Sequence, residues 1–218
     1  YFLNPVDPDE DVSFEVEPVR DGRSFALRQV TTVQAGIPRA RFLCSFHIDE
    51  QGEVDYQLAP LTELAGPDHY EDSEWDMPID LRVADPVPAG DGTYVASGRH
   101  LVRVKGPLPD SSAVHACLVA YLSDQTRISY RPYSEEAWGT HTDASLDHAL
   151  WFHRPARADT WLRYELQALS ARGNRAMVRG LMYNEAGELV MSMAQELLVR
   201  PLPGGEPQLP PWRRFERT

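Results

Sequence analysis

The sequence predicts an α+β fold with several strands and one long helix. Three features carry this prediction: one helix-periodic segment that begins at Ser111, alternating apolar and polar stretches on both sides of it, and an internal repeat that gives the same strand pattern twice. The 218 residues suit one large or two small domains, and 42% hydrophobic residues are enough to form a core. We therefore expect a globular chain with two related halves.

The long helix is expected from Ser111 to about Asp124. Its apolar residues follow the i, i+3, i+4, i+7, i+8 spacing of a helix buried along one face, and they are Val114, Cys117, Leu118, Tyr121 and Leu122. Pro107 and Pro109 prevent an earlier start. Asp124 then lies at the carboxyl end, where the helix dipole disfavours an ionised carboxylate by a few tenths to about 1 kcal/mol.

A strand is expected from Ser145 to Pro155, because apolar and polar residues alternate there. One face of this strand would carry Leu146, His148, Leu150 and Phe152. Two shorter strands, Ile79–Val83 and His100–Val104, are expected ahead of the helix.

The internal repeat relates the start of the chain to the segment after the helix. Tyr1–Pro5 aligns with Trp151–Pro155 at an offset of 151 − 1 = 150. The alignment continues at alternating apolar positions, in the pairs Val12/Leu162, Phe14/Tyr164 and Val16/Leu166. After one inserted residue, placed before Asp21, Arg28 matches Arg179. Both copies therefore read as three strands joined by glycine-containing turns, with the strands of the first copy near 12–19, 24–34 and 38–48.

The repeat also sets the expected domain boundaries. Residues 1–50 form a first repeat that lacks a leading strand and helix, so we expect the intact protein to be longer at its N-terminus. Residues 51–77 are an acidic linker, whose charge favours a solvated surface over a site. The complete second repeat is 78–200, and 201–218 is a proline-rich tail.

The last predicted strand places a primary amide on an apolar face. Gln195 lies on the same strand face as Leu189, Met191, Met193, Leu197 and Val199. A buried amide without a partner costs roughly 1–3 kcal/mol, so Gln195 is expected to be hydrogen-bonded, either to backbone in a structural role or within a site. The aligned residue of the first repeat, at 195 − 151 = 44, is Cys44, so only the second repeat carries this amide.

Charge and cysteine content exclude several classes of function. A net charge of −12 and a pI near 5.0 argue against nucleic acid or an anionic membrane as the main partner, because phosphate binding needs a basic surface. No apolar run reaches the roughly 18 residues of a membrane span, so no membrane insertion is expected. Cys44 and Cys117 lie in apolar runs and are expected to be buried free thiols, which favours a cytoplasmic location.

Several segments resemble the acyl-CoA thioesterase II (TesB-type) family. They agree with that family in order and spacing, and they are Ala120–Asp124, Ser145–Pro155, Arg172–Arg175 and Ala194–Glu196. Tyr1–Leu3 and Arg20–Ser24 resemble the first half of the family, so the likeness runs from Tyr1 to about Arg200. The resemblance implies a double hotdog, in which each repeat wraps a curved antiparallel sheet around one long helix, and it implies a homo-oligomer.

The same resemblance implies a catalytic set. The positions that activate a water against the thioester in the family are Asp124, Ser145 and Gln195 here, with serine in place of the more usual threonine. The expected function is hydrolysis of acyl-CoA to free acid and coenzyme A, with no cofactor and no metal. A non-catalytic acyl-CoA-binding or scaffolding hotdog is the alternative.

Four further residues are candidates for supporting roles. His148 lies on an apolar face, where a histidine is more often a satisfied core residue than a catalyst. Asp147 either caps the strand or orients His148, so both are assigned to the shell behind the catalytic set. Arg175 and Arg179 are candidates for contacting the phosphates of coenzyme A, although a solvated sheet face explains exposed arginines as well.

Overall fold

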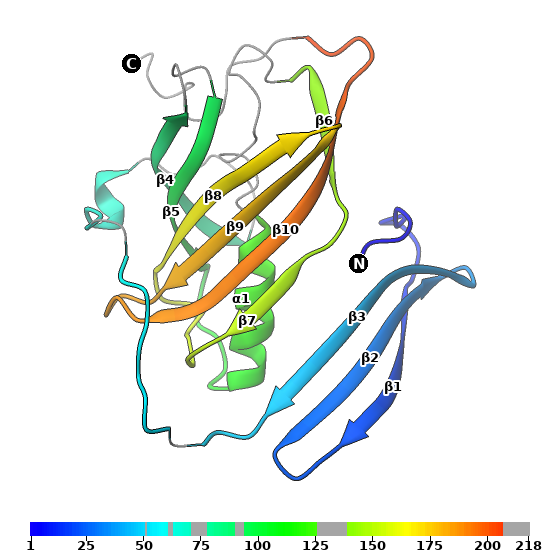
Figure 1. Ribbon diagram of the computed structural model, residues 1–218, viewed down its shortest axis with the longest axis vertical. Coiled ribbons are helices and arrows are strands. Elements are labelled where there is room, and N and C mark those ends of the chain that lie inside the picture. Colours follow the sequence, from blue (N-terminus) through cyan, green and yellow to red (C-terminus); the bar gives the residue numbers. More distant parts are fainter. Residues whose placement is uncertain (51, 61–62, 71–77, 90–93, 126–138, 207–218) are drawn as a thin grey trace. The chain divides into compact units, whose positions relative to one another are not determined.

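The computed structural model describes residues 1–50, 52–60, 63–70, 78–89, 94–125 and 139–206. These residues divide into two compact units, coloured along the chain in Figure 1. The first unit is Tyr1–Tyr56 with Ser145–Asp147, and the second is Gln57–Ala144 with His148–Thr218.

The first unit is built on a three-stranded antiparallel sheet, in the order β1 (Ser13–Asp21), β2 (Phe25–Gln34) and β3 (Ile37–His47). The strands predicted near 12–19, 24–34 and 38–48 are thus confirmed to within two residues at each end. A fourth strand, predicted near residues 1–4, is wrong, because only the single bridge from Phe2 to Ala40 forms there. Ala35 and Gly36 join β2 to β3 with φ of 51° and 75°, because a two-residue hairpin turn that matches strand twist needs both residues in the left-handed region.

The second unit carries a seven-stranded sheet and the one α-helix in the described part of the chain (Figure 1). The sheet order is β4 (Ile79–Ala89), β5 (Tyr94–Val104), β8 (Leu162–Arg172), β9 (Arg175–Tyr183), β10 (Leu189–Pro201) and β6 (His141–Ser145), and β7 (Ala149–Phe152) also pairs with β10. The two short strands predicted ahead of the helix are present within the longer β4 and β5.

Both sheets contain the same three-stranded pattern, down to its irregularities. The β1–β2 register shifts between Pro18 and Arg20, and the β8–β9 register shifts 150 positions later, between Ala168 and Ser170. The next hairpin of each sheet also has matching shifts, at Thr32/Val33 and at Leu189/Met191. Bulges re-aim strands at fixed places. Their recurrence confirms the internal repeat as a structural one.

The register corrects one detail of the sequence alignment. Pro18 pairs with Arg28 as Ala168 pairs with Val178, so Gln29, not Arg28, occupies the position of Arg179. The extra residue of the second repeat therefore lies in the β9–β10 connection. Four residues separate Val33 from Pro38, whereas five separate Tyr183 from Leu189.

The helix α1 (Ser112–Gln125) begins and ends within one residue of its predicted bounds, but its buried face was predicted only in part. Leu122 is buried and Leu118 packs against the core, as predicted. The buried residues are His115, Val119, Leu122 and Ser123. Cys117 and Tyr121, predicted to be buried, are exposed. Because no charged residue occurs between Asp110 and Asp124, apolar side chains lie all around the helix and their spacing does not fix which face packs.

The hydrophobic core belongs to the second unit. It packs α1 against one face of the sheet through buried residues of α1 and of β4, β5, β8, β9 and β10. Tyr164, Leu166, Met191 and Met193 are at most 2% exposed. In the first unit the repeat-equivalent residue of Tyr164, Phe14, is 62% exposed, so the same pattern encloses a core in only one of the two units.

The single strand predicted from Ser145 to Pro155 is wrong. The structure has β6 ending at Ser145 and β7 beginning at Ala149. The interruption coincides with a backbone hydrogen bond made elsewhere: the carbonyl of Leu146 accepts the Phe2 N–H across 3.0 Å. A backbone group that bonds elsewhere cannot continue the ladder with β10 at that residue.

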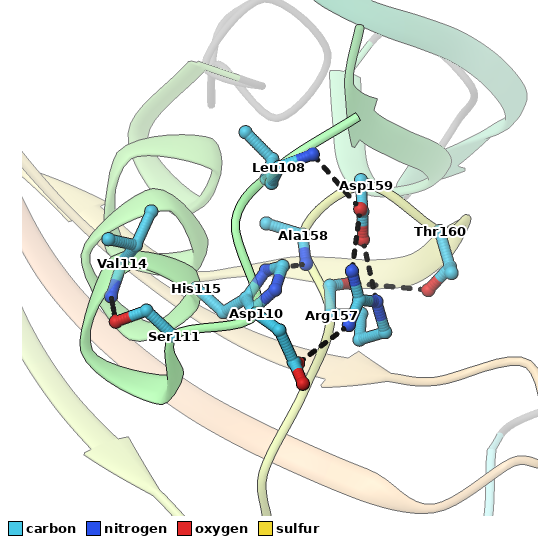
Figure 2. A network of polar contacts seen from close by, with 9 residues as sticks. All are labelled: Leu108, Asp110, Ser111, Val114, His115, Arg157, Ala158, Asp159 and Thr160. Carbon is cyan, nitrogen blue, oxygen red and sulfur yellow. Dashed lines mark hydrogen bonds and ion pairs between the residues drawn. The ribbon is translucent and has the colours of Figure 1, made fainter. Parts of the chain in front are cut away.

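A polar network fixes the start of α1 (Figure 2). Arg157 donates to Asp159 at 2.9–3.0 Å and to Asp110 at 3.1 Å, and Asp159 accepts the Leu108 N–H. The Arg157 hydrogen bond holds the pKa of Asp159 at about 2. His115 Nδ1 accepts the Ala158 N–H at 3.1 Å, which ties the first turn of α1 to the segment before β8. A pocket of about 370 Å³ opens beside this network.

Three remaining expectations fall on other parts of the chain. Both cysteines are free thiols, but Cys44 is only half-buried and Cys117 is exposed, so their predicted burial is wrong. Trp212 and Phe215, which the sequence suggests as anchors of the proline-rich tail on the surface, lie outside the described residues. None of the helices in the described ranges has the length and apolar character needed to cross a bilayer.

Candidate active site

Asp124 and Gln195 meet inside the second unit. Gln195 lies on β10 between Met193 and Leu197, and it is fully buried. Its Nε2 donates to Asp124 Oδ1 across 3.1 Å. Asp124 is the second-last residue of α1, and its side chain is 33% exposed. The buried Gln195 amide thus has the carboxylate of Asp124 as a partner, and both residues belong to the catalytic set expected from the sequence.

His148 joins this pair from the segment just before β7. Its Nδ1 lies 3.9 Å from Asp124 Oδ1, and its Nε2 lies 2.9 Å from Ser123 Oγ. Ser123 itself donates its hydroxyl hydrogen to the Ala120 carbonyl at 2.7 Å, one turn back in α1. The His148 side chain is 11% exposed, so the imidazole is held in a largely dry setting beside the carboxylate.

Tyr164 fixes the end of α1 from the sheet side. It is fully buried on β8, and its hydroxyl donates to the Ser123 carbonyl at 3.1 Å. The ring needs Gly180 on the neighbouring strand β9, because a Cβ there would come within 2.5 Å of a Tyr164 ring carbon. From the sequence, Tyr164 was identified only as the repeat equivalent of Phe14. A tyrosine at a buried position, whose hydroxyl requires a partner, was the available signal.

Ser145 and Asp147 belong to the first unit. Ser145 is the last residue of β6, and Asp147 lies between β6 and β7. The chain between them is anchored by the Phe2–Leu146 backbone hydrogen bond. Their joint action with Asp124 and Gln195 stays a prediction.

Arg175 and Arg179 project from the exposed side of β9. Arg175 pairs with Glu196 at 3.3 Å, and Arg179 Nε donates to Gln167 at 2.9 Å. Both side chains thus bridge neighbouring strands, and contacts of this exposed kind contribute little to stability. Their predicted role in binding the phosphates of coenzyme A stays a prediction.

The chemistry available at the site is that of a carboxylate, an amide and an imidazole. In the described part of the chain no three or more His, Cys, Asp or Glu side chains are grouped to hold a metal ion. A carboxylate can take a proton from water, and a fixed amide can orient that water. Such an arrangement suits hydrolysis without a covalent intermediate.

Comparison with solved structures identifies the fold. The chain is similar to a protein of unknown function with a hot dog fold from Alicyclobacillus acidocaldarius, with a TM-score of 0.67 and 16% identity over 87% of this chain and 72% of that one. The antiparallel sheet packed on a single helix is therefore the hotdog arrangement, as expected.

Closer relatives define the family. Residues 69–198 match the acyl-CoA thioesterase family, and residues 1–47 match its N-terminal domain. An acyl-CoA thioesterase II, TesB2, from Mycobacterium marinum aligns with a TM-score of 0.83 and 34% identity, covering 94% of this chain and 79% of that one. Human acyl-coenzyme A thioesterase 8 is 29% identical over 93% of this chain and 72% of that protein. The chain belongs to the acyl-CoA thioesterase family, and so to the hydrolases.

Proposed function

We propose that this chain hydrolyses acyl-CoA thioesters to a free carboxylic acid and coenzyme A through a water activated by Asp124, Ser145 and Gln195. The observation that carries the proposal is the hydrogen bond from the buried Gln195 amide to the Asp124 carboxylate. Membership of the acyl-CoA thioesterase family supports the substrate class.

In this mechanism Asp124 is the general base. Because the Gln195 nitrogen is directed at Asp124, the direction of the amide oxygen is fixed as well. That oxygen can accept one O–H of the attacking water while Asp124 removes the other proton. The Ser145 hydroxyl would hold the water or the oxyanion that develops on the thioester carbonyl. Bringing these groups together in one geometry is what lowers the barrier.

The remaining assignments complete the proposal. Asp147 and His148 support the catalytic residues without contacting the substrate. Arg175 and Arg179 bind the phosphates of coenzyme A. Residues 1–50 and 78–200 act as two hotdog repeats joined by the linker 51–77, and the chain self-associates through exposed strands and faces. Sedimentation at micromolar concentration tests the assembly, and a monomer alone would contradict it.

Release of free thiol from a panel of acyl-CoAs of increasing chain length tests the function. We expect thiol and the matching free acid in equal amounts from the wild-type chain. Asp124→Asn is the control for contaminating hydrolases and should release thiol at least about 100-fold more slowly. Saturable binding of acyl-CoA without any thiol release would instead support the non-catalytic alternative.

A further inference from the structure

We infer that His148 shares the proton that Asp124 removes from water, and that Ser123 prepares it by fixing which ring nitrogen carries hydrogen. This inference rests on the proposed hydrolysis, because it concerns the fate of a proton released in that reaction. It makes His148 a positioning residue that acts through Asp124.

The hydrogen-bond directions determine the tautomer. The Ser123 hydroxyl has one hydrogen, and it goes to the Ala120 carbonyl at 2.7 Å. Ser123 Oγ must therefore accept the 2.9 Å bond to His148, so His148 Nε2 carries a hydrogen. A neutral imidazole carries only one N–H. His148 Nδ1 is then the basic nitrogen, and it is the atom that lies 3.9 Å from Asp124 Oδ1.

This places two proton acceptors side by side. An imidazole is intrinsically a stronger base than a carboxylate, so a proton taken up by Asp124 can pass to His148 Nδ1. The product of that transfer is an imidazolium facing a carboxylate. Because the His148 side chain is 11% exposed, the attraction between those charges is screened less than at the surface.

Tyr164 keeps the arrangement from shifting. Its hydroxyl holds the Ser123 carbonyl while the Ser123 hydroxyl holds His148, so β8 anchors the residue that sets the tautomer. Gln195 holds the same Asp124 oxygen, Oδ1, that faces His148. The carboxylate, the amide and the imidazole thus lie on α1, on β10 and on the segment before β7, respectively.

The proton and electrons balance as follows. The water oxygen bonds to the thioester carbonyl carbon while the π electron pair of the C=O bond moves onto the carbonyl oxygen, and one water proton moves to Asp124 and on to His148. The oxyanion then re-forms the C=O bond as the carbon–sulfur bond breaks, so the carboxylic acid is released and the electron pair of the broken bond leaves with sulfur as a thiolate. His148 returns the proton to Asp124, which passes it to that thiolate or to solvent and so restores the starting state.

The variant His148→Gln separates this role from a structural one. The glutamine amide nitrogen can replace Nε2–H toward Ser123, but no basic atom then faces Asp124. We expect kcat to fall about 10- to 100-fold with KM within about twofold, which is the lower part of the range for losing a proton acceptor. In mixtures of light and heavy water, the wild-type rate should follow a curved, two-proton dependence, and that of His148→Gln a linear one.

A matched control is available on the same stretch of chain. His153 Nε2 bonds to Ser192 Oγ at 2.9 Å, the same kind of histidine–serine pair, but in an exposed position and with no part in the proposed site. His153→Gln should retain the wild-type kcat and the curved dependence on heavy water. Thermal melting of both variants checks that they are folded.

Nitrogen NMR of the wild-type histidines gives a second readout that needs no variant. We expect neutral His148 to carry its hydrogen on Nε2. A hydrogen on Nδ1, a wild-type kcat in His148→Gln, or a reduced kcat with an unchanged heavy-water curve would each overturn the inference while leaving the hydrolysis intact. Absence of thiol release by the wild-type chain would be a failure of the proposed function itself.

Discussion

Gln195 and Asp124, 71 positions apart in the chain, are joined by a 3.1 Å hydrogen bond from an amide nitrogen to a carboxylate oxygen. The sheet register shows that the two repeats differ at this position, because the residue of β3 that is equivalent to Gln195 is Cys44. Among the described residues, the bond between amide and carboxylate is therefore a feature of the second repeat.

Replacing Gln195 by leucine should lower kcat by roughly 10²–10³ with little change in KM, because the water loses its orienting group. Leucine suits the apolar neighbours Met193 and Leu197, so the melting temperature should stay within a few degrees of wild type. Thiol-release kinetics and thermal melting measure the two quantities. A lower melting temperature with normal turnover per folded molecule would indicate a purely structural amide.

Cys44→Ser should leave kcat unchanged. Cys44 occupies the repeat position of Gln195 but is a half-buried free thiol. A serine there changes one atom and removes no proposed catalytic group. Steady-state kinetics of the variant checks this, and a tenfold loss of kcat would show that the first repeat contributes to the chemistry.

Gly180→Ala should destabilise the chain by about 1–3 kcal/mol and lower kcat several-fold. The added Cβ would come within 2.5–2.6 Å of the Tyr164 ring and hydroxyl, so Tyr164 must move away from the Ser123 carbonyl at the end of α1. Gly66→Ala is the control, since a Cβ there meets nothing within 4 Å. Equal urea-unfolding midpoints for the two variants would contradict the prediction.

Stability should fall as the pH drops from about 6.5 to about 4 because of His100. Burial lowers the pKa of this fully buried histidine on β5 to about 4, against a hydrogen bond with Tyr164 that raises it. Below pH 6.5 His100 becomes protonated in the unfolded chain but stays neutral in the folded chain, so the free energy of unfolding falls by about 2 kcal/mol between pH 7 and pH 5. Above pH 6.5 His100 is neutral in both states and no longer makes stability depend on pH.

Urea unfolding at the two pH values, with His100→Leu as the comparison, measures this contribution. The wild-type chain should lose about 2 kcal/mol more than the variant between pH 7 and pH 5. Parallel losses in both proteins would show that His100 is not the group responsible.

The repeat and most element bounds followed from the sequence because they depend on local periodicity. Alternation and the internal repeat predicted β1, β2 and β3, and the helix bounds followed from the prolines before Ser111 and from helical spacing. The buried face of α1 followed only in part, because no charged residue before Asp124 marks a polar side of the helix. The break between Ser145 and Ala149 did not follow either, since it depends on a bond to Phe2 that is remote in sequence.

The candidate site was only partly predictable. Gln195 was found because an amide on an apolar strand face needs a partner, and Asp124 through the helix motif of the family. The roles of Ser123 and Tyr164 depend on which atoms meet across α1 and β8, and the sequence carries no pattern for that.

The most direct test of the account is the turnover of Asp124→Asn, a variant that keeps the shape of the side chain and removes its charge. Asp124 is the group from which both the proposed hydrolysis and the role of His148 follow. We expect a folded protein, judged by thermal melting, with KM near that of wild type and kcat reduced by roughly 10²–10⁴. A well-folded Asp124→Asn variant with full kcat would contradict the account.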